Sequence, residues 1–277
     1  MRKLIIGVLV VAGLAVVTDF GAAAYSEYRV SRALRVGADL SADPEVTING
    51  FPFLGQALDG RYQSVGLRAQ VVRPDIPGQI YVDAALTGVH LSFGDLTDGN
   101  VRRVPVERLE ARMVLEPIEL GRLFNIPDLQ VHSRPADKSD GTGGSGGSGM
   151  TTADGLVLTG TLPVAGTRPS TGTRLGANGT PLTGDKVSVQ ADLKLEGDQV
   201  TITATGFYRG TSPDLTTTVE VPEADRPAVL ARFSRTIDTK ELPFGITPTK
   251  VFARGGQIQV EGKGENVTID LDRLRRP

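Results

Sequence analysis

The sequence contains no cysteine and no tryptophan, and its two histidines, His90 and His132, stand far apart. The missing cysteines exclude disulfide bonds, thiol nucleophiles, thiolate metal sites and anchoring through a lipidated cysteine. Two separated imidazoles argue against a histidine-based catalytic triad and against a zinc site with several histidine ligands. We therefore predict neither a metal site nor a cofactor.

Sequence motifs of the common enzyme classes are also missing. No HExxH or Walker A pattern occurs. The carboxylates, such as Glu107 and Glu110, fall at alternating positions of strand-like segments, where they keep a surface soluble. A formal net charge of -2 provides no general attraction to nucleic acid. We predict a protein that is not an enzyme, has no catalytic residues and does not bind nucleic acid.

The N-terminus combines a basic start, Met1-Arg2-Lys3, with an apolar run from Leu4 to Val17. A run of this length is typical of a signal-peptide core, and Ala22-Ala23-Ala24 resembles a cleavage site. If Asp19 is tolerated near its end, the run is long enough for a tilted membrane helix. Residues 1–25 are thus predicted to be a signal sequence or an N-terminal membrane anchor. The protein is expected on the extracytoplasmic face of the plasma membrane, either anchored or released after cleavage.

The remainder of the chain is rich in strand patterns. Residues 61–72, 79–93 and 104–115 alternate between apolar and polar side chains, and Pro117 suits the start of a short helix. We predict that residues 26–277 form a single domain of mainly β (α+β) class. The expected architecture is a curved, elongated antiparallel sheet or half-barrel wrapped around one or two amphipathic helices, similar to a lipid-binding tube.

The second half continues this pattern. A Gly/Ser-rich insertion at 135–152 is predicted to be disordered, because it contains almost nothing that a core could bury. A helix is expected from Pro227 through Ile237. Further strands are predicted at 156–162, 187–195, 199–208, 249–253, 257–261 and 266–271, with Gly262-Lys263-Gly264 as the last turn.

Two turns concentrate large apolar side chains in a chain with only 9 phenylalanines. Such residues either plug the end of a core or face an apolar ligand, and the sequence leaves both readings open. On the second reading they form the wall or rim of a lipid site. The predicted lipid-binding residues are Phe51, Pro52, Phe53, Leu54, Leu242, Pro243 and Phe244. Arg61, Arg68 and Arg73 are the candidates for binding a phosphate headgroup.

Several of these segments together resemble one family. They are Pro44-Glu45-Val46-Thr47-Ile48, Gly50-Phe51-Pro52-Phe53-Leu54, Gly60-Arg61-Tyr62 with Val65, and Leu242-Pro243-Phe244-Gly245. In this order the chain is similar to the actinobacterial LmeA-like family of phospholipid-binding envelope proteins. The resemblance implies an extracytoplasmic, membrane-associated, non-enzymatic lipid binder. It also implies a connection with building inositol-lipid-anchored mannans, in which some members are implicated.

Two functions remain in view. The first is an extracytoplasmic phospholipid-binding protein that supports the assembly or transfer of envelope lipids or lipoglycans. Its partners would be the membrane and a phospholipid, anionic by expectation, with inositol phospholipids among the candidates. The alternative is a structural or adaptor protein that supports a membrane-bound envelope enzyme and carries no lipid. A tail-shaped apolar cavity favours the first function, and a solid core favours the second.

Overall fold

The computed structural model describes residues 1–37, 40–73, 76–98, 103–133, 155–162, 174–175, 181–182, 184–209, 220–239 and 246–270. Leu242, Pro243, Phe244 and the insertion predicted at 135–152 lie outside these residues, and only the backbone of Arg73 is described. The helices are α1 (Arg2–Gly37), α2 (Phe53–Asp59), α3 (Phe93–Asp98), α4 (Pro117–Phe124), the 3-10 helix η2 (Glu223–Asp225) and α5 (Arg226–Arg232).

Two antiparallel sheets form the body of the molecule. The first has the order β1-β2-β3-β4-β13-β12, with β1 (Glu45–Asn49), β2 (Arg61–Arg73), β3 (Ile76–His90), β4 (Arg103–Leu115), β13 (Gln257–Asp270) and β12 (Pro248–Arg254). The second has the order β11-β10-β9-β6-β5, with β11 (Arg235–Asp238), β10 (Gln199–Phe207), β9 (Asp185–Glu196), β6 (Gly155–Leu162) and β5 (Gln130–Ser133). A small pair joins β7 (Arg174–Leu175) and β8 (Pro181–Leu182).

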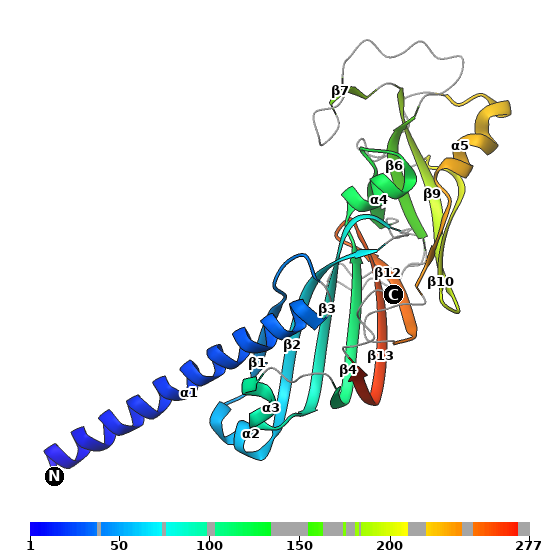
Figure 1. The fold of residues 1–277 in the computed structure, drawn as a ribbon. Coiled ribbons are helices and arrows are strands. Elements are labelled where there is room, and N and C mark those ends of the chain that lie inside the picture. The colour runs from blue at the N-terminus through cyan, green and yellow to red at the C-terminus, as the bar shows by residue number, and fades with distance from the viewer. Residues whose placement is uncertain are drawn as a thin grey trace, which may run out of the picture.

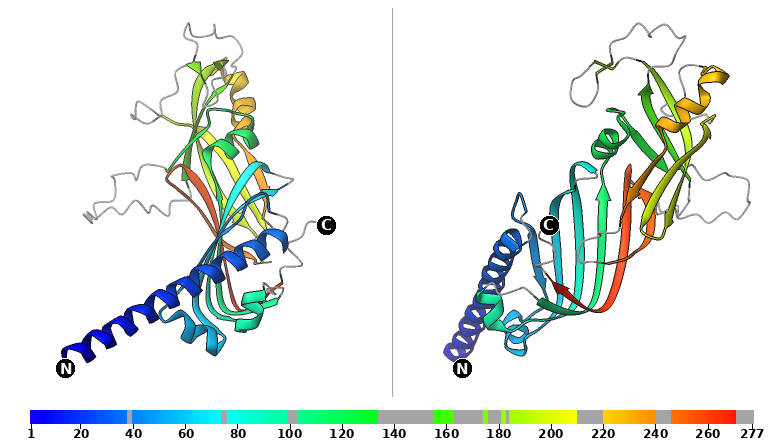
Figure 2. Two further views of the ribbon diagram at one scale, coloured as in Figure 1. Left: turned by 60° about the vertical axis from the view of Figure 1, so that its left-hand side comes forward. Right: turned by 45° about the vertical axis from the view of Figure 1, so that its right-hand side comes forward.

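The sheets follow one another along an elongated molecule, and α1 projects from one end (Figures 1 and 2). Both sheets are curved and open, and helices lie against them. This arrangement confirms the predicted fold class of a mainly β, α+β protein with an elongated antiparallel sheet.

Two predicted boundaries near the C-terminus are wrong. Gly262-Lys263-Gly264 is not a turn but the middle of β13, because Gly262 pairs with Ala111 and Lys263 pairs with Glu110 of β4. The last helix, α5, ends at Arg232, and Ile237 belongs to β11, where it pairs with Val200. In both cases pairing with a distant strand overrides the local pattern.

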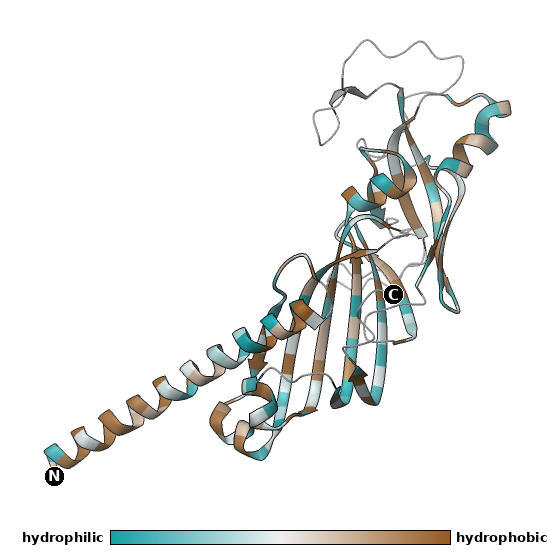
Figure 3. Ribbon diagram, in the orientation of Figure 1, coloured by the Kyte–Doolittle hydropathy of each residue, from teal (hydrophilic) through white to brown (hydrophobic). Residues whose placement is uncertain are grey.

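The core consists of two buried clusters. One lies between α4, α5 and parts of both sheets, and it includes Phe124, Phe233 and Leu156. The other lies between α1, α2, α3 and the first sheet, and it includes Phe53 and Leu109. Apolar residues also cover the projecting half of α1, as Figure 3 shows.

The first sheet bends where three neighbouring strands change their side-chain alternation at the same level. Val65, Leu86 and Leu109 form one row across β2, β3 and β4, and Tyr62, Val89 and Val106 form the next row. The rows are three residues apart in each strand, yet their members pack in one cluster. Strict alternation would put them on opposite faces, so each strand interrupts its alternation between the two rows, while the pairing register stays the same from one row to the other.

Candidate functional site

A small apolar cavity lies at this bend, between α1, α3 and the first sheet. Its volume is about 70 Å³. Four members of the two rows, on β2 and β3, form part of its wall on the sheet side, and α1 and α3 close the opposite side. The lining residues are Val30, Leu34, Val46, Ile48, Tyr62, Val65, Leu67, Leu86, Val89, Leu91, Leu96, Val104 and Ile269.

Tyr62 brings the only polar side chain to this lining. The residue is 1% exposed, and its ring packs on Phe53 with centroids 6.0 Å apart. Its hydroxyl has no hydrogen-bond partner among the residues that the structure describes. Burial raises the pKa of Tyr62 to about 12, so the phenol is neutral and available as a donor. A buried hydroxyl without a partner is unfavourable, and an acceptor atom on a ligand would relieve that penalty.

A cation lies beside the cavity on the helix side. Arg29 of α1 donates from Nε to the carbonyl oxygen of Thr97, 3.0 Å away, and thereby connects α1 to α3. Its neighbour Val30 lines the cavity, as does Leu96, the neighbour of Thr97. Arg29 therefore places a positive charge where α1 contacts α3, the two helices that close the cavity.

The predicted lipid-binding turn lies next to this site but does not line it. Phe53 is buried and supports the ring of Tyr62, and Leu54 is half-buried against the same cluster. Phe51 is 63% exposed and stacks on Phe20 of α1. Pro52 precedes α2 after a cis peptide bond. Lipid contact by these four residues stays a prediction.

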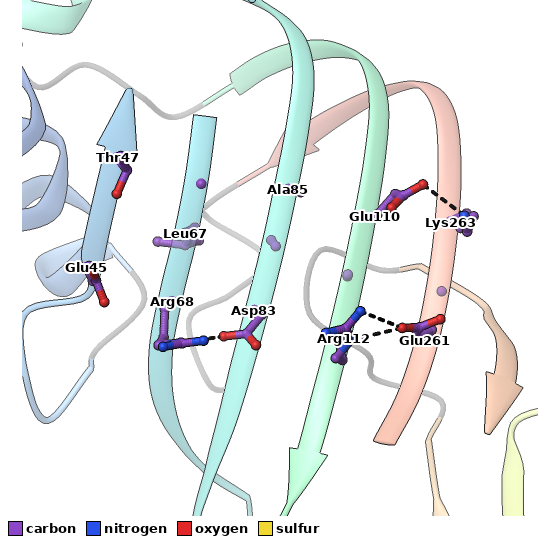
Figure 4. Close-up of a pocket in the computed structure, with 14 residues that line it drawn as sticks. Glu45, Thr47, Leu67, Arg68, Asp83, Ala85, Glu110, Arg112, Glu261 and Lys263 are labelled. Atoms are coloured by element: carbon purple, nitrogen blue, oxygen red, sulfur yellow. Dashed lines mark hydrogen bonds and ion pairs between the residues drawn. The ribbon is translucent and has the colours of Figure 1, made fainter. Parts of the chain in front are cut away.

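The opposite face of the sheet is polar and is hollowed by a groove of about 390 Å³ (Figure 4). One row across the strands alternates in charge, as Glu45, Arg68, Asp83, Arg112 and Glu261. Ion pairs connect these charges, with 2.7 Å between Arg68 and Asp83 and 2.7 Å between Arg112 and Glu261. The groove therefore offers compensated charge rather than a field of one sign.

A second row across the groove contains two small residues, and their small size produces the hollow. It includes Gly66 and Ala85, which pair with each other, followed by Glu110 and Lys263. Lys263 donates to Glu110 over 2.8 Å, and this hydrogen bond lowers the pKa of Glu110 and raises that of Lys263. Both side chains are exposed, so the pair contributes little to stability.

Two of the predicted headgroup residues, Arg61 and Arg68, form ion pairs with carboxylates of neighbouring strands. Arg68 donates to Asp83, and the hydrogen bond raises the pKa of Arg68. Arg61 donates to Glu107 over 2.6 Å, and His90 also contacts that carboxylate. The structure brings neither arginine to the apolar cavity, and the side chain of Arg73 is outside the described part. Headgroup binding by these three residues stays a prediction.

None of the predicted lipid-binding residues that the structure describes lines the cavity. Its residues were recognised as strand or helix positions, not as a site. The available signal was an apolar spacing of three, Leu86 to Val89 and Val106 to Leu109, repeated in neighbouring strands. Within the described ranges, no group of three or more His, Asp and Glu residues is arranged to hold a metal ion.

Comparison with known proteins gives one match. The model of a family described as LmeA-like phospholipid-binding matches residues 17–263, from the middle of α1 into β13. Searches of curated proteins and of solved structures gave no match. Because the family model covers most of the chain, including the cavity-forming strands β1 to β4, the chain belongs to the LmeA-like phospholipid-binding family.

Proposed function

We propose that the protein is an extracytoplasmic phospholipid-binding protein that takes an acyl chain between α1, α3 and the bent sheet. The observation that carries this proposal is the apolar cavity with one buried phenol, whose hydroxyl has no hydrogen-bond partner among the described residues. Apolar walls favour a hydrocarbon chain, and the phenol supplies one donor for an ester or phosphate oxygen. Each buried methylene contributes about 0.8 kcal/mol before ordering costs.

The cavity must widen to hold a lipid. A volume of about 70 Å³ is close to two water molecules' share of liquid volume, roughly 30 Å³ each. Sites for larger ligands span about 300–1,000 Å³. The shorter of the two lining helices is α3, which the Arg29–Thr97 hydrogen bond connects to α1. On this proposal, uptake of a chain moves α3 and α1 apart from the sheet.

With the acyl chain in the cavity, the headgroup lies where α1 contacts α3. Arg29 is the cation nearest in sequence to the lining residue Val30, and its guanidinium suits a phosphate oxygen. This placement supports a preference for anionic phospholipids, inositol phospholipids among them. A role in assembling or transferring envelope lipids or lipoglycans is the extension that the family resemblance suggests.

One observation favours the adaptor function instead. The cavity is small, and the buried cluster between α4, α5 and both sheets is tightly closed, with Phe124, Phe233 and Leu156 each 0% exposed. A protein that only supports a membrane-bound enzyme needs no larger cavity. The two functions differ in a measurable property, which is the retention of lipid by the purified protein.

The test uses the full chain, because α1 forms part of the cavity. Delipidated protein is incubated with diacyl phospholipid, and native mass spectrometry counts the bound lipid. We expect one lipid per chain on the wild type and loss of that lipid on Val65→Phe, whose larger side chain fills the cavity. Val72→Phe is the matched control, because Val72 lies on the same strand, is exposed and does not line the cavity.

Two results contradict the proposal. The first is a wild type that retains no lipid, which favours the adaptor function. The second is equal retention by Val65→Phe and Val72→Phe, which places the lipid elsewhere. The thermal unfolding midpoint of each variant is measured in parallel, since filling a core position costs about 1–3 kcal/mol when the neighbours cannot adjust.

A further inference from the structure

No residue that the structure describes covers the first half of α1. Its side chains are exposed from Leu4 to Val17, and only 6% of the most apolar window, with a mean hydropathy of 2.4, is buried. This degree of exposure distinguishes it from the core helix of a soluble protein. At 1.5 Å per residue, Arg2 to Thr18 spans about 25 Å, close to the thickness of a bilayer's hydrocarbon core.

The second half of the same helix is part of the body, starting at Asp19. The Asp19 side chain is buried, and its two carboxylate oxygens accept hydrogen bonds from the backbone N–H groups of Phe53 and Leu54, each over 2.8 Å. These are the first two residues of α2, whose N–H groups have no partner within that helix. Asp19 thereby fastens α2 directly to α1.

The small residues that resemble a cleavage site also pack against the body of the protein. Ala22 and Ala23 pack against the buried cluster of the first sheet, and Ser26 is buried. Cleavage at Ala22–Ala24 would remove Asp19 and leave the first two N–H groups of α2 without their acceptor. The structure therefore favours a helix that is retained over one that is removed.

Beside the point where α1 enters the body lies a set of exposed apolar side chains, here called the α2 corner: Phe20, Phe51 and Leu58. Phe20 and Phe51 are each 63% exposed, and Leu58 is 84% exposed. The two rings stack with centroids 6.2 Å apart, although they come from α1 and from the turn before α2. Phe20 also follows the exposed Val17 by one turn of α1, so this surface continues the apolar surface of the projecting helix (Figures 1 and 3).

We propose that α1 stays attached as a membrane anchor and that the α2 corner is a second membrane contact, held at the bilayer surface by Asp19. The occupant is a lipid bilayer because the surface is continuous with a helix of membrane-spanning length. Exposed apolar side chains at the end of such a helix lie where the headgroup region begins. The contact depends on α1 and α2 alone and is independent of the apolar cavity.

Because the chain has no tryptophan, the Phe51→Trp variant carries a single fluorescent reporter. The full-length variant is reconstituted into phosphatidylcholine–phosphatidylglycerol vesicles whose acyl chains carry bromine close to the headgroup. We expect a blue-shifted emission that brominated lipid quenches several-fold more than in the control. The control is Ile118→Trp, a partly exposed apolar position on α4 in the body. Equal, weak quenching of the two variants would overturn the proposal.

The role of Asp19 is tested in the same vesicles by adding Asp19→Ala to Phe51→Trp. We expect the quenching to fall toward the Ile118→Trp level while the protein still floats with the vesicles. Unchanged quenching would show that Asp19 does not hold the corner. The intact mass of the chain recovered from native membranes is the second measurement, and a chain that starts after Ala24 would also overturn the proposal. Lipid retention by native mass spectrometry reports on the cavity separately.

Discussion

At the scale of single residues, the ring of Tyr62 contributes to folding, and we assign its hydroxyl to ligand binding. Its ring fills the core beside Phe53, and its hydroxyl contacts no described polar group. A side chain chosen only for packing would be phenylalanine, which keeps the ring and omits the buried oxygen. The hydroxyl therefore needs a partner that the protein's own described residues do not provide, and a bound lipid or a water molecule fits that need.

Replacing Tyr62 with phenylalanine should affect the two properties in opposite directions. The delipidated Tyr62→Phe variant is expected to be as stable as the wild type or more stable by about 1 kcal/mol, because no buried donor stays unpaired. Its lipid retention should fall, because the donor to the ligand is lost. Thermal unfolding and native mass spectrometry measure the two effects. A clear loss of stability with unchanged lipid retention would show that the hydroxyl bonds to protein.

The raised pKa of Tyr62 also predicts that the folded protein loses stability at high pH. Its pKa is about 12 in the folded protein and about 10 in an unfolded chain, so between these values only the unfolded state releases the proton. Stability from this group is complete below pH 10 and is lost as the pH rises toward 12, by about 1.4 kcal/mol per unit. Unfolding of wild type and Tyr62→Phe at pH 9 and pH 11 isolates the effect. Parallel losses in the two proteins would contradict it.

The two phenylalanines of the Phe-Pro-Phe turn should behave differently. Phe53 is 1% exposed, so Phe53→Ala is expected to cost about 3–5 kcal/mol of folding free energy. Phe51→Ala is the matched control and should change stability little in detergent, because that ring is mostly exposed. Comparable melting of the two variants would mean that the turn does not anchor the core.

At the scale of elements, the aligned irregularities of β2, β3 and β4 create the cavity. In β3 the irregularity lies at Gly88, whose φ is +63°. Residues with a Cβ rarely adopt this backbone conformation. A Cβ at this position would also meet the carboxylate of Glu107 on β4. The bend thus depends on a glycine and on the strand beside it.

Gly88→Ala should accordingly destabilise the protein by more than about 1 kcal/mol, through backbone strain and contact with Glu107. Adding Glu107→Ala should recover the part due to contact and leave the part due to strain. Chemical or thermal unfolding of the four proteins in this cycle measures the coupling. If the two substitutions were simply additive, Gly88 and Glu107 would not be in contact at the bend.

The same elements show how far the sequence could be interpreted. Alternation within 79–93 and 104–115 predicts β3 and β4, because period two is a local property, although β3 ends at His90 and Phe93 begins α3. The cavity needs the slips of three strands to coincide, and their register depends on pairing between distant residues, which no single segment contains. For the same reason Gly262 and Gly264 suggested a turn, although β4 pairs with that segment as a continuous strand.

At the scale of the whole molecule, one sheet has two different faces. The apolar face carries α1, α3 and the cavity, and the other face carries paired charges in an open groove. The sequence contains the cations of both faces, but it does not show on which face each of them lies. Arg61 and Arg68 stood out because they lie on a predicted strand, whereas Arg29 belonged to a helix whose position over the sheet was unknown.

The final prediction decides which face meets the headgroup. If the lipid lies in the cavity, Arg29→Gln should reduce the preference for anionic over zwitterionic phospholipid several-fold, while Arg68→Gln, whose guanidinium is paired with Asp83 on the other face, should not. Native mass spectrometry with equimolar lipid mixtures measures this preference. Raising the salt concentration should lower the preference and leave total retention nearly unchanged, because screening acts on exposed charge and not on apolar burial. The reverse result, a loss with Arg68→Gln alone, would place the headgroup in the charged groove, and retention would then be independent of Val65.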